Sequence, residues 1–265
     1  MERQRHKIVI LGSGNVATHL AQALDKHADV VQVWSRSSDN ARTLASRLRN
    51  SDATADINDL RSDADFYLVC VADDGIRDVV KGIKGVSGVI ASTSGSISLI
   101  DFKSCTVTGA VGVFYPLQTF TKEADLDISH VPFLIEASDK ETTRKLKKLA
   151  SLVSDKVFEA DSELRVHLHL AAVFSNNFVN HLWTLADGYL KDKTGFDIHI
   201  LEPLLKETLR KALASSPAKA QTGPARRNDR LIIEKHLDML DDGKAEIYRL
   251  LSESIIKTYS SGQNE

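Results

Sequence analysis

The chain has 265 residues, of which 42% are hydrophobic, so it is long enough to bury one large core or two smaller ones. Its formal net charge of -2 argues against a strongly basic surface, and we expect neither nucleic acid nor a membrane as a partner. The first apolar run is too short for a signal peptide or a membrane span, and the two cysteines, Cys70 and Cys105, form no CxxC pair. The protein is expected in the cytoplasm, with both cysteines packed and unreactive.

Residues 1–160 alternate short β-rich runs with helix-like stretches. In chain order the apolar runs are KIVILG, VVQVWS, DFYLVCVA, GVIAST and CTVTGAVGVF, and stretches such as NVATHLAQALDKH and DNARTLASRLRN lie between them. A further unit follows, in which VPFLIEA and DKVFEA flank a charged helix predicted over residues 138–153. Continuous apolar strands that alternate with helices predict an α/β fold with a parallel sheet covered on both faces.

Strand signals end after residue 160, and the rest of the chain has a helical pattern. Helices are predicted over residues 162–191, 203–214, 229–240 and 244–259. The segment SSPAKAQTGPARRND is the longest irregular stretch, and SSGQNE is expected to form a frayed tail. We therefore divide the chain into an α/β domain at residues 1–160 and an all-helical domain at residues 161–265.

The first predicted strand, KIVILG, runs directly into GSGNVA, a G-x-G-x-x-A pattern. Gly12 allows a tight turn, Gly14 lets the backbone approach a pyrophosphate, and Ala17 keeps the following helix close to the strand. Free amides at the helix N-terminus then favour an anion. This context favours a Rossmann dinucleotide-binding domain over a flavin site, a methyl-donor site or a purely structural turn. The predicted pyrophosphate-binding residues are Gly12, Ser13, Gly14, Asn15 and Val16.

The end of the second predicted strand separates these options. An NAD site or a methyl-donor site needs Asp or Glu there, about 20 residues past the glycines, to bind a ribose hydroxyl pair. This chain has WSRSS instead, so Ser35, Arg36 and Ser37 present hydroxyls and a guanidinium where the 2′-phosphate of NADP would lie. NADP(H) is therefore preferred over NAD(H), with a solvated surface charge as the alternative role of Arg36.

The carboxyl ends of later strands are expected to close on the same cofactor, because open α/β sheets bind ligands at that edge. The run DFYLVCVA ends near Val71 and Ala72, and GVIAST leads into STSGS. Small residues of this kind are equally common in ordinary strand-to-helix turns. Candidates for the nicotinamide side are Val71, Ala72, Ser92, Thr93, Ser94 and Gly95.

Residues 167–181, HLHLAAVFSNNFVNH, combine a helical apolar face with amides and imidazoles. At about 100° per residue, His169, Asn176 and Asn180 fall in one narrow sector, opposite the apolar side chains. A face meant only for bulk water usually carries Lys and Glu, so this uncharged stripe favours a wet cleft in which a ligand is held by hydrogen bonds. The alternative is a helix packed on other helices, with its amides satisfied internally.

With GSGNVA, WSRS, STSGS, FYPLQTF, HLHLAAVFSNNFVNHLW and QTGPARRND, the chain resembles a family of two-domain Rossmann proteins of unassigned function, grouped as candidate NADP oxidoreductases. FYPLQTF and TGPARR are specific to that family. More distantly, the chain is similar to pyrroline-carboxylate reductases, ketopantoate reductases and β-hydroxyacid dehydrogenases. Those proteins pair an N-terminal Rossmann domain with an all-helical C-terminal domain, bind substrate between the two and often dimerise through their helical domains. The resemblance therefore implies an interdomain cleft and a homodimer.

The resemblance also implies that the 162–191 helix forms one wall of that cleft. In the β-hydroxyacid dehydrogenases, the corresponding helix supplies a catalytic lysine followed by an asparagine about one turn later. Here Asn176 or Asn177 matches the asparagine, but Val173 stands in the place of the lysine. His169, one turn earlier on the same face, is the substitute proton donor, and a core histidine is the alternative.

Substrate-binding residues follow from the same resemblance. Related dehydrogenases place substrate-facing residues after the last Rossmann strand, which here gives Tyr115, Gln118 and Thr119. In the TGPARR segment, Arg226 and Arg227 are either solvated or turned into the cleft, where a guanidinium binds a carboxylate or phosphate. The full set of predicted substrate-binding residues is Tyr115, Gln118, Thr119, Asn177, Thr222, Arg226 and Arg227.

We therefore predict an NADP(H)-dependent oxidoreductase that passes hydride to a small anionic oxo- or imino-compound. Asn176 or Asn180 would polarise the C=O or C=N bond, and His169, or a water that it orders, would protonate the product. A cofactor-binding sensor without turnover is the alternative, which the missing lysine supports. A metal-dependent hydrolase is disfavoured and no metal site is predicted, because histidines two apart, like His167 and His169, point to nearly opposite sides of a helix.

Overall fold

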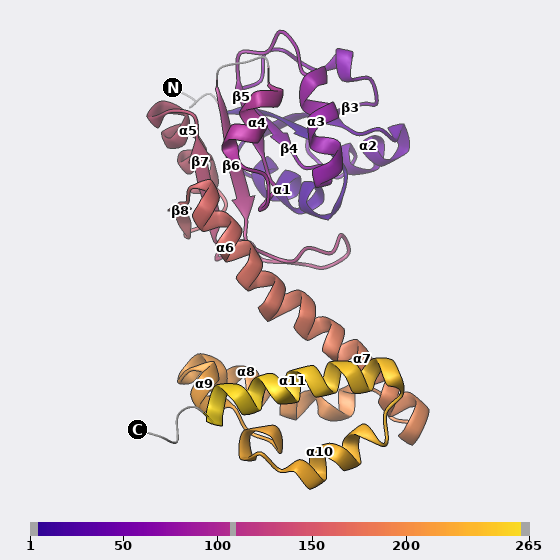
Figure 1. Cartoon of the computed structure of the whole chain (residues 1–265). Helices are drawn as coiled ribbons and strands as arrows, with labels where there is room; N and C mark the ends of the chain where they lie inside the picture. The colour runs from indigo at the N-terminus through magenta and orange to yellow at the C-terminus, as the bar shows by residue number, and fades with distance from the viewer. Residues whose placement is uncertain (1–4, 107–109, 261–265) are drawn as a thin grey trace. The chain divides into compact units, whose positions relative to one another are not determined.

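The computed structural model describes residues 5–106 and 110–260, and it confirms the predicted fold class of an α/β domain followed by a helical region. The chain divides into two compact units, residues 1–174 and 175–265. Figure 1 shows the sheet and its helices in the first unit and helices in the second. The last strand ends at Glu159 and helices follow, while the compact units divide later, so the predicted domain boundary at residue 160 stays a prediction.

Within the described residues, eight strands of the first unit form one sheet in the order β3-β2-β1-β4-β5-β6-β7-β8. The chain builds β2 and β3 on one side of β1 and then returns to place β4 on the other side, as in a Rossmann sheet. The strands are β1 (Lys7–Leu11), β2 (Asp29–Trp34), β3 (Asp52–Thr54), β4 (Phe66–Val69), β5 (Val89–Ser92), β6 (Val111–Pro116), β7 (Phe133–Ala137) and β8 (Val157–Glu159).

The pairing within the sheet differs from the prediction at one place. The strands are parallel except that β7 runs antiparallel to β6. Residues 117–132 connect these two strands without a helix, so the chain turns back beside β6 rather than crossing over the sheet. The expectation of an entirely parallel sheet was wrong here, and the short strand β3 was not predicted.

The sheet separates two apolar cores, as predicted for a sheet covered on both faces. Ile10 of β1 packs on one face with Leu20 of α1, whereas its neighbour Val9 packs on the other with Ile76 of α3 and Phe102 of α4. Each fully buried side chain of this kind contributes roughly 1.5–3 kcal/mol to folding. The helices of this unit are α1 (Asn15–Asp25), α2 (Ser38–Ala45), the short 3-10 helix η1 (Ile57–Asp59), α3 (Asp73–Gly82), α4 (Leu99–Cys105) and α5 (Lys140–Ala150).

The C-terminal helices match the predicted spans, and none among the described residues is both long and apolar enough to cross a membrane. Short helices α9 and η4 interrupt the stretch that was expected to be irregular, and α4 and η1 were not predicted. Part of the predicted tail, residues 261–265, and residues 107–109 of the fifth apolar run lie outside the described residues. The elements are α6 (Ser162–Ala172), η2 (Val173–Phe178), α7 (Val179–Thr194), η3 (Ile198–Leu201), α8 (Glu202–Ala214), α9 (Pro217–Ala220), η4 (Ala225–Arg227), α10 (Arg230–Leu237) and α11 (Asp242–Ser260).

The predicted helix over residues 162–191 is helical throughout, but it is not one α-helix. Its middle segment, η2, is a π-helix, in which hydrogen bonds close over one more residue than in an α-helix. The count of 100° per residue therefore does not hold from His169 to Asn180, and the single polar stripe drawn through both was wrong in its geometry. Such π-helical turns occur frequently at functional sites.

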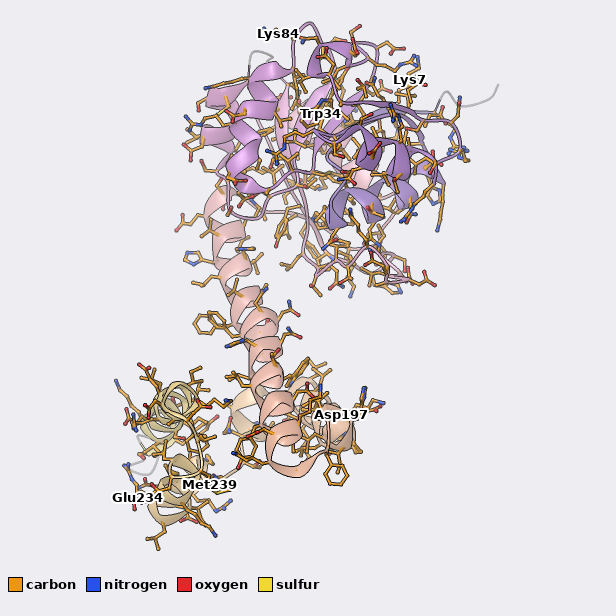
Figure 2. The ribbon with its side chains drawn as sticks, turned by 90° about the vertical axis from the view of Figure 1, so that its right-hand side faces the viewer. Lys7, Trp34, Lys84, Asp197, Glu234 and Met239 are labelled. Atoms are coloured by element: carbon orange, nitrogen blue, oxygen red, sulfur yellow. The ribbon has the colours of Figure 1, made fainter. Side chains whose placement is uncertain are left out.

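The second unit buries few side chains. Among its described residues, 175–260, only Ala225, Ile233 and Ser252 are buried. Large apolar side chains stand exposed in this unit, including Leu213 of α8 at 78% and Met239, just after α10, at 52%. Figure 2 labels Met239 among the side chains of this unit. In the first unit, by contrast, even the large Trp34 is only 5% exposed.

Candidate functional site

A cavity of about 320 Å³ opens at the carboxyl ends of β1, β2 and β4. This is the point where the strand order reverses, and open α/β sheets bind their ligands there. The structure thus brings together three segments that the sequence singled out separately: the glycine turn, WSRS and the end of DFYLVCVA. The wall is formed by Gly12, Ser13, Gly14, Trp34, Ser35, Arg36, Ser37, Asn40, Cys70, Val71 and Ala72.

The two glycines of the turn have different roles. Gly12 is buried with a φ of 127°, and a Cβ placed on it would lie 2.5 Å from the carbonyl oxygen of Cys70, so only glycine fits. A Cβ on Gly14 would meet no atom within 4 Å, which leaves open space above the backbone. Gly14 is also the N-cap of α1 and provides no side-chain hydrogen bond, so the amides of the first turn face that space uncapped.

The side chains after β2 are arranged around one free guanidinium. Arg36 is exposed and lines the cavity, and it forms no ion pair within residues 5–106 and 110–260. Ser35 and Ser13 join the two loops through their hydroxyl oxygens, 2.9 Å apart. The Ser37 hydroxyl accepts the amide of Asn40 at 3.3 Å and caps α2. No carboxylate lines this cavity, so Arg36 gives it a positive edge.

The segment after β5 is held mainly by its own hydroxyls. Ser92 accepts the amide of Ser94 at 3.1 Å, and Thr93 donates to the carbonyl oxygen of Val69 at 3.1 Å. The Ser94 hydroxyl in turn accepts amides further along the turn, including that of Ile97 at 3.3 Å. These three residues are buried and do not line the cavity, so their side chains shape the turn.

A second group of predicted residues meets at the ends of β5 and β6. The hydroxyl oxygen of Tyr115 lies 3.1 Å from Nδ1 of His169, and the two rings meet edge to face with centroids 6.1 Å apart. Both side chains are half-buried. Burial is the main cause of a raised Tyr115 pKa, so its hydroxyl is protonated at neutral pH. Sequence patterns identified each residue but did not pair them.

Helix α6, which carries His169, is fixed to the first unit by a buried ion pair that the sequence did not reveal. The Arg165 guanidinium is fully buried and binds the carboxylate of Glu136 on β7 and the carbonyl oxygen of Ile97. Ser162 donates to the same carboxylate at 2.8 Å and accepts the amide of Leu99 at 2.9 Å. Because residues 162, 165 and 169 share one helix face, these contacts also set the position of His169.

The comparisons with known proteins agree with this arrangement. Two family models match the chain, a Rossmann-like domain over residues 1–119 and a domain of unknown function, DUF2520, over residues 131–255. No curated protein matches it. A structure of a candidate NADP oxidoreductase from Bacteroides fragilis is 40% identical, covers 96% of this chain and 99% of its own, and has a TM-score of 0.90. The chain belongs to this family of two-domain Rossmann proteins.

More distant structures share the fold. A pyrroline-5-carboxylate reductase from Streptococcus pyogenes is 15% identical with a TM-score of 0.61, over 98% of this chain and 100% of that one. A reductive aminase from Aspergillus terreus, solved with NADPH and ethyl levulinate, is 15% identical with a TM-score of 0.66, over 98% and 95% of the two chains. At these identities the likeness shows a common architecture only.

The remaining predicted site residues lie apart from the cavity or in the second unit. Gln118 and Thr119 are exposed just after β6, and the side-chain oxygen of Gln118 accepts the Thr119 amide at 2.8 Å. Arg226 stacks on the ring of Tyr259, with its guanidinium carbon 4.4 Å from the ring centroid. Val16 of α1 is half-buried, packs against the core and does not line the cavity. The other residues, all exposed, are Asn15 at the start of α1 and, in the second unit, Asn176, Asn177, Asn180, Thr222 and Arg227. Their predicted parts in the site stay predictions.

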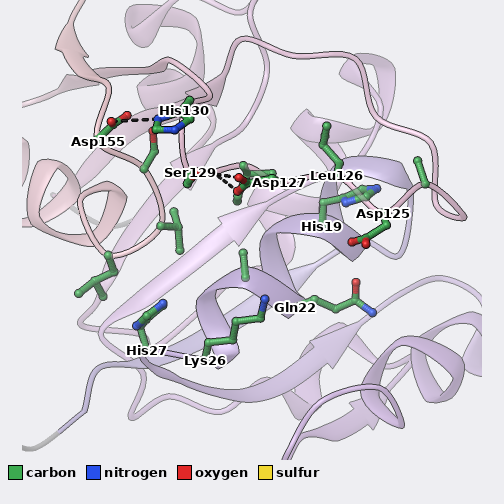
Figure 3. A pocket seen from close by; sticks show the side chains of 16 residues that line it. His19, Gln22, Lys26, His27, Asp125, Leu126, Asp127, Ser129, His130 and Asp155 are labelled. Carbon is green, nitrogen blue, oxygen red and sulfur yellow. Dashed lines mark hydrogen bonds and ion pairs between the residues drawn. The ribbon is translucent and has the colours of Figure 1, made fainter.

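A larger cavity of about 670 Å³ lies between α1 and residues 124–130 (Figure 3). Several polar groups around it are already satisfied nearby: His19 bonds the carbonyl oxygen of Thr121 at 2.7 Å, and Nδ1 of His130 lies 2.9 Å from the carboxylate of Asp155. No group of three or more metal-binding side chains occurs in the described part of the chain. We therefore place the candidate site at the glycine turn, where the backbone leaves open space and a guanidinium has no partner.

Proposed function

We propose that the chain is an NADP(H)-dependent oxidoreductase that reduces a small anionic oxo- or imino-compound. The observation that carries the proposal is the cavity at the glycine turn, which combines uncapped α1 amides with the unpaired guanidinium of Arg36 and has no carboxylate in its wall. The 40% identical relative, described as a candidate NADP oxidoreductase, supports the same cofactor.

The residues of the cavity fit the parts of NADP(H). The open backbone at Gly14 and the α1 amides would hold the pyrophosphate, and Arg36 would bind the 2′-phosphate. Val71 and Ala72, at the end of β4, would border the nicotinamide side. When bound, the cofactor supplies a hydride to the acceptor carbon. The two free, buried cysteines suit a reducing compartment such as the cytoplasm.

The substrate would lie between the two domains, as the resemblance to related reductases implies. His169 would deliver the proton, and Asn176 or Asn180 would polarise the double bond. Arg226 or Arg227 would bind the anionic group, with Tyr115, Gln118, Thr119, Asn177 and Thr222 around it. Pyrroline-5-carboxylate, named for one of the structural neighbours, is an imino acid of this class.

A second copy of the chain is the partner that we propose for the helical unit. Large apolar side chains of α7, α8 and α11 are exposed, among them Trp183, Leu213 and Leu250. A homodimer through these helices, as in the related families, would cover them.

The experiment is a pair of fluorescence titrations with NADPH and NADH, on the wild type and on Arg36→Ala. NADPH should bind tightly to the wild type and about 10- to 100-fold more weakly to the variant, with NADH affinity unchanged. Arg42→Ala is the matched control, because Arg42 is an exposed arginine nearby that pairs with Asp39 and does not line the cavity. If neither NADPH nor NADH binds, the proposal is contradicted. Binding without turnover on any carbonyl or imine would favour a sensor.

A further inference from the structure

Three segments far apart in the sequence converge on the pair formed by Tyr115 and His169. Tyr115 comes from β6, His169 from α6, and Gly95 from the turn after β5. A Cβ placed on Gly95 would lie 2.6 Å from Cζ of Tyr115 and 2.9 Å from Nδ1 of His169. The pair thus rests against a backbone position where no side chain fits, and the glycine in STSGS makes room for it.

The charges around the pair restrict what Tyr115 can do alone. Burial raises its pKa most, the Asp73 carboxylate raises it further, and the Arg165 guanidinium lowers it. Arg165 is already bound to Glu136, so it is not free to balance a tyrosinate fully. A half-buried phenol of raised pKa loses its proton less readily than an exposed one, unless another proton arrives as the first one leaves. Nδ1 of His169 lies at hydrogen-bond distance and is a group that can supply that proton.

We propose that Tyr115 is the catalytic acid of the proposed reductase and that His169 delivers its proton to the substrate through Tyr115. This inference rests on the proposed function. As the acceptor carbon gains its hydride, the π electron pair of the C=O or C=N bond moves to the heteroatom. The heteroatom takes the Tyr115 proton, and the proton on Nδ1 of a protonated His169 passes to the phenol oxygen. His169 ends neutral and is reprotonated from solvent, which reaches it because it is only half-buried.

The first test needs no substrate. Tyrosines labelled with ¹³C at Cζ are titrated by NMR in the NADPH-bound protein, and Tyr115→Phe assigns the Tyr115 signal. In His169→Phe the phenol loses its hydrogen-bonding partner, so Tyr115 should titrate about one pH unit higher, the shift expected for one hydrogen bond. His167→Phe is the control on the exposed side of the same helix. An unchanged Tyr115 titration in His169→Phe overturns the pair and the relay with it.

The second test follows NADPH oxidation with two acceptors, pyrroline-5-carboxylate and ethyl levulinate with ammonia. Tyr115→Phe and His169→Ala should each lower kcat by about 100-fold or more, with the NADPH Kd unchanged, and the double variant should lose no more than the worse single variant. Added imidazole should restore His169→Ala but not the double variant, because the phenol is missing there. Gly95→Ala should lower kcat, whereas Gly75→Ala, whose Cβ meets only Val71 at 3.7 Å, should not.

The outcomes separate the relay from the proposed function. Near-normal kcat in Tyr115→Phe, or rescue of the double variant by imidazole, means that His169 reaches the substrate directly and overturns the relay alone. No NADPH oxidation with either acceptor, despite tight NADPH binding, counts against the reductase and the relay together. The NMR titration would then still report whether the two side chains share a hydrogen bond.

Discussion

The two units of the chain differ in how far their apolar side chains are buried and their polar groups hydrogen-bonded. In the first unit, apolar side chains are buried on both faces of a sheet, and polar groups such as Ser92 and the two terminal nitrogens of Arg165 bind partners within the unit. In the second, only Ala225, Ile233 and Ser252 are buried among the described residues, and large apolar side chains stand exposed. A unit that buries so little apolar surface gains little hydrophobic stabilisation by itself.

This contrast indicates a division of roles. The first unit contains the candidate site, since the cavity, the Tyr115–His169 pair and the anchor of α6 all lie within residues 1–174. The second unit exposes large apolar side chains, and we infer that its stability depends on a partner chain that covers them. Variants that damage only one of these properties therefore test the distinction directly.

The largest effect is expected at the glycine turn. Gly12→Ala forces a Cβ to within 2.5 Å of the Cys70 carbonyl oxygen at a φ of 127°, so it should lower Tm by several degrees and abolish NADPH binding. Gly14→Ala meets no atom within 4 Å and should keep the wild-type Tm, while losing most NADPH affinity because the methyl group fills the ligand's space. Calorimetry and fluorescence titration measure the two quantities separately. Equal NADPH affinity in Gly14→Ala and the wild type would contradict the assigned turn.

Removing one partner of the buried ion pair should have the next largest effect. Arg165→Met leaves Glu136 without its guanidinium in a mostly buried position, and breaking such a pair costs about 3–5 kcal/mol. Replacing both residues, in Arg165→Met with Glu136→Gln, should recover part of the loss. Urea unfolding gives both values. A loss below about 1 kcal/mol in the single variant would show that α6 is held by other contacts.

Charged substitutions on the second unit should weaken self-association. Leu213→Glu on α8 places a carboxylate at a leucine that is 78% exposed, and we expect about 100-fold weaker dimerisation by sedimentation. Ile100→Glu is the matched control, because Ile100 is 82% exposed but belongs to the first unit. A wild-type chain that sediments as a monomer at all concentrations would remove the proposed partner.

Local patterns predicted the strands other than β3, the glycine turn and most helices, because each depends on residues close in sequence. Gly12 and Arg36 were identified in this way, through motif spacing alone. The antiparallel direction of β7 depends on the path of the connection over residues 117–132, and the π-helix η2 depends on one extra residue within a helical turn. Neither feature changes the hydrophobic period of the sequence noticeably, so the pattern did not predict them.

Contacts between residues far apart in the sequence could not be predicted, because local patterns depend only on residues close in sequence. Arg165 looks like an ordinary helix-surface charge until Glu136, 29 residues earlier, is placed beside it. Tyr115 and His169 are 54 residues apart. Only the folded chain shows that both side chains pack against Gly95, where a Cβ would collide with them. Candidate residues could thus be named from sequence, while their pairing required the structure.

The smallest predicted effect concerns a helix cap in the first unit. Asp139 caps α5, and hydrogen bonds from the Thr142 amide and hydroxyl lower the pKa of its carboxyl to about 2, below its ordinary value of 3.8. Because the folded pKa is the lower one, the stabilisation is complete above about pH 4 and is lost as pH falls towards 2. Asp139→Ala should cost about 1 kcal/mol at neutral pH, typical of a lost cap, and this difference from the wild type should shrink over that pH range.

Urea unfolding of both proteins between pH 2 and pH 7 measures this difference. Asp229→Ala, which removes the cap of α10 in the second unit, is the companion variant. If the second unit is stable only in a dimer, the urea midpoint of unfolding of Asp229→Ala, like that of the wild-type second unit, should rise with protein concentration, since association adds to the stability of the folded form. The midpoint of the transition that Asp139→Ala lowers should not depend on concentration, because α5 packs within the first unit, whose apolar cores are buried. A similar concentration dependence in both variants would erase the distinction between the two units.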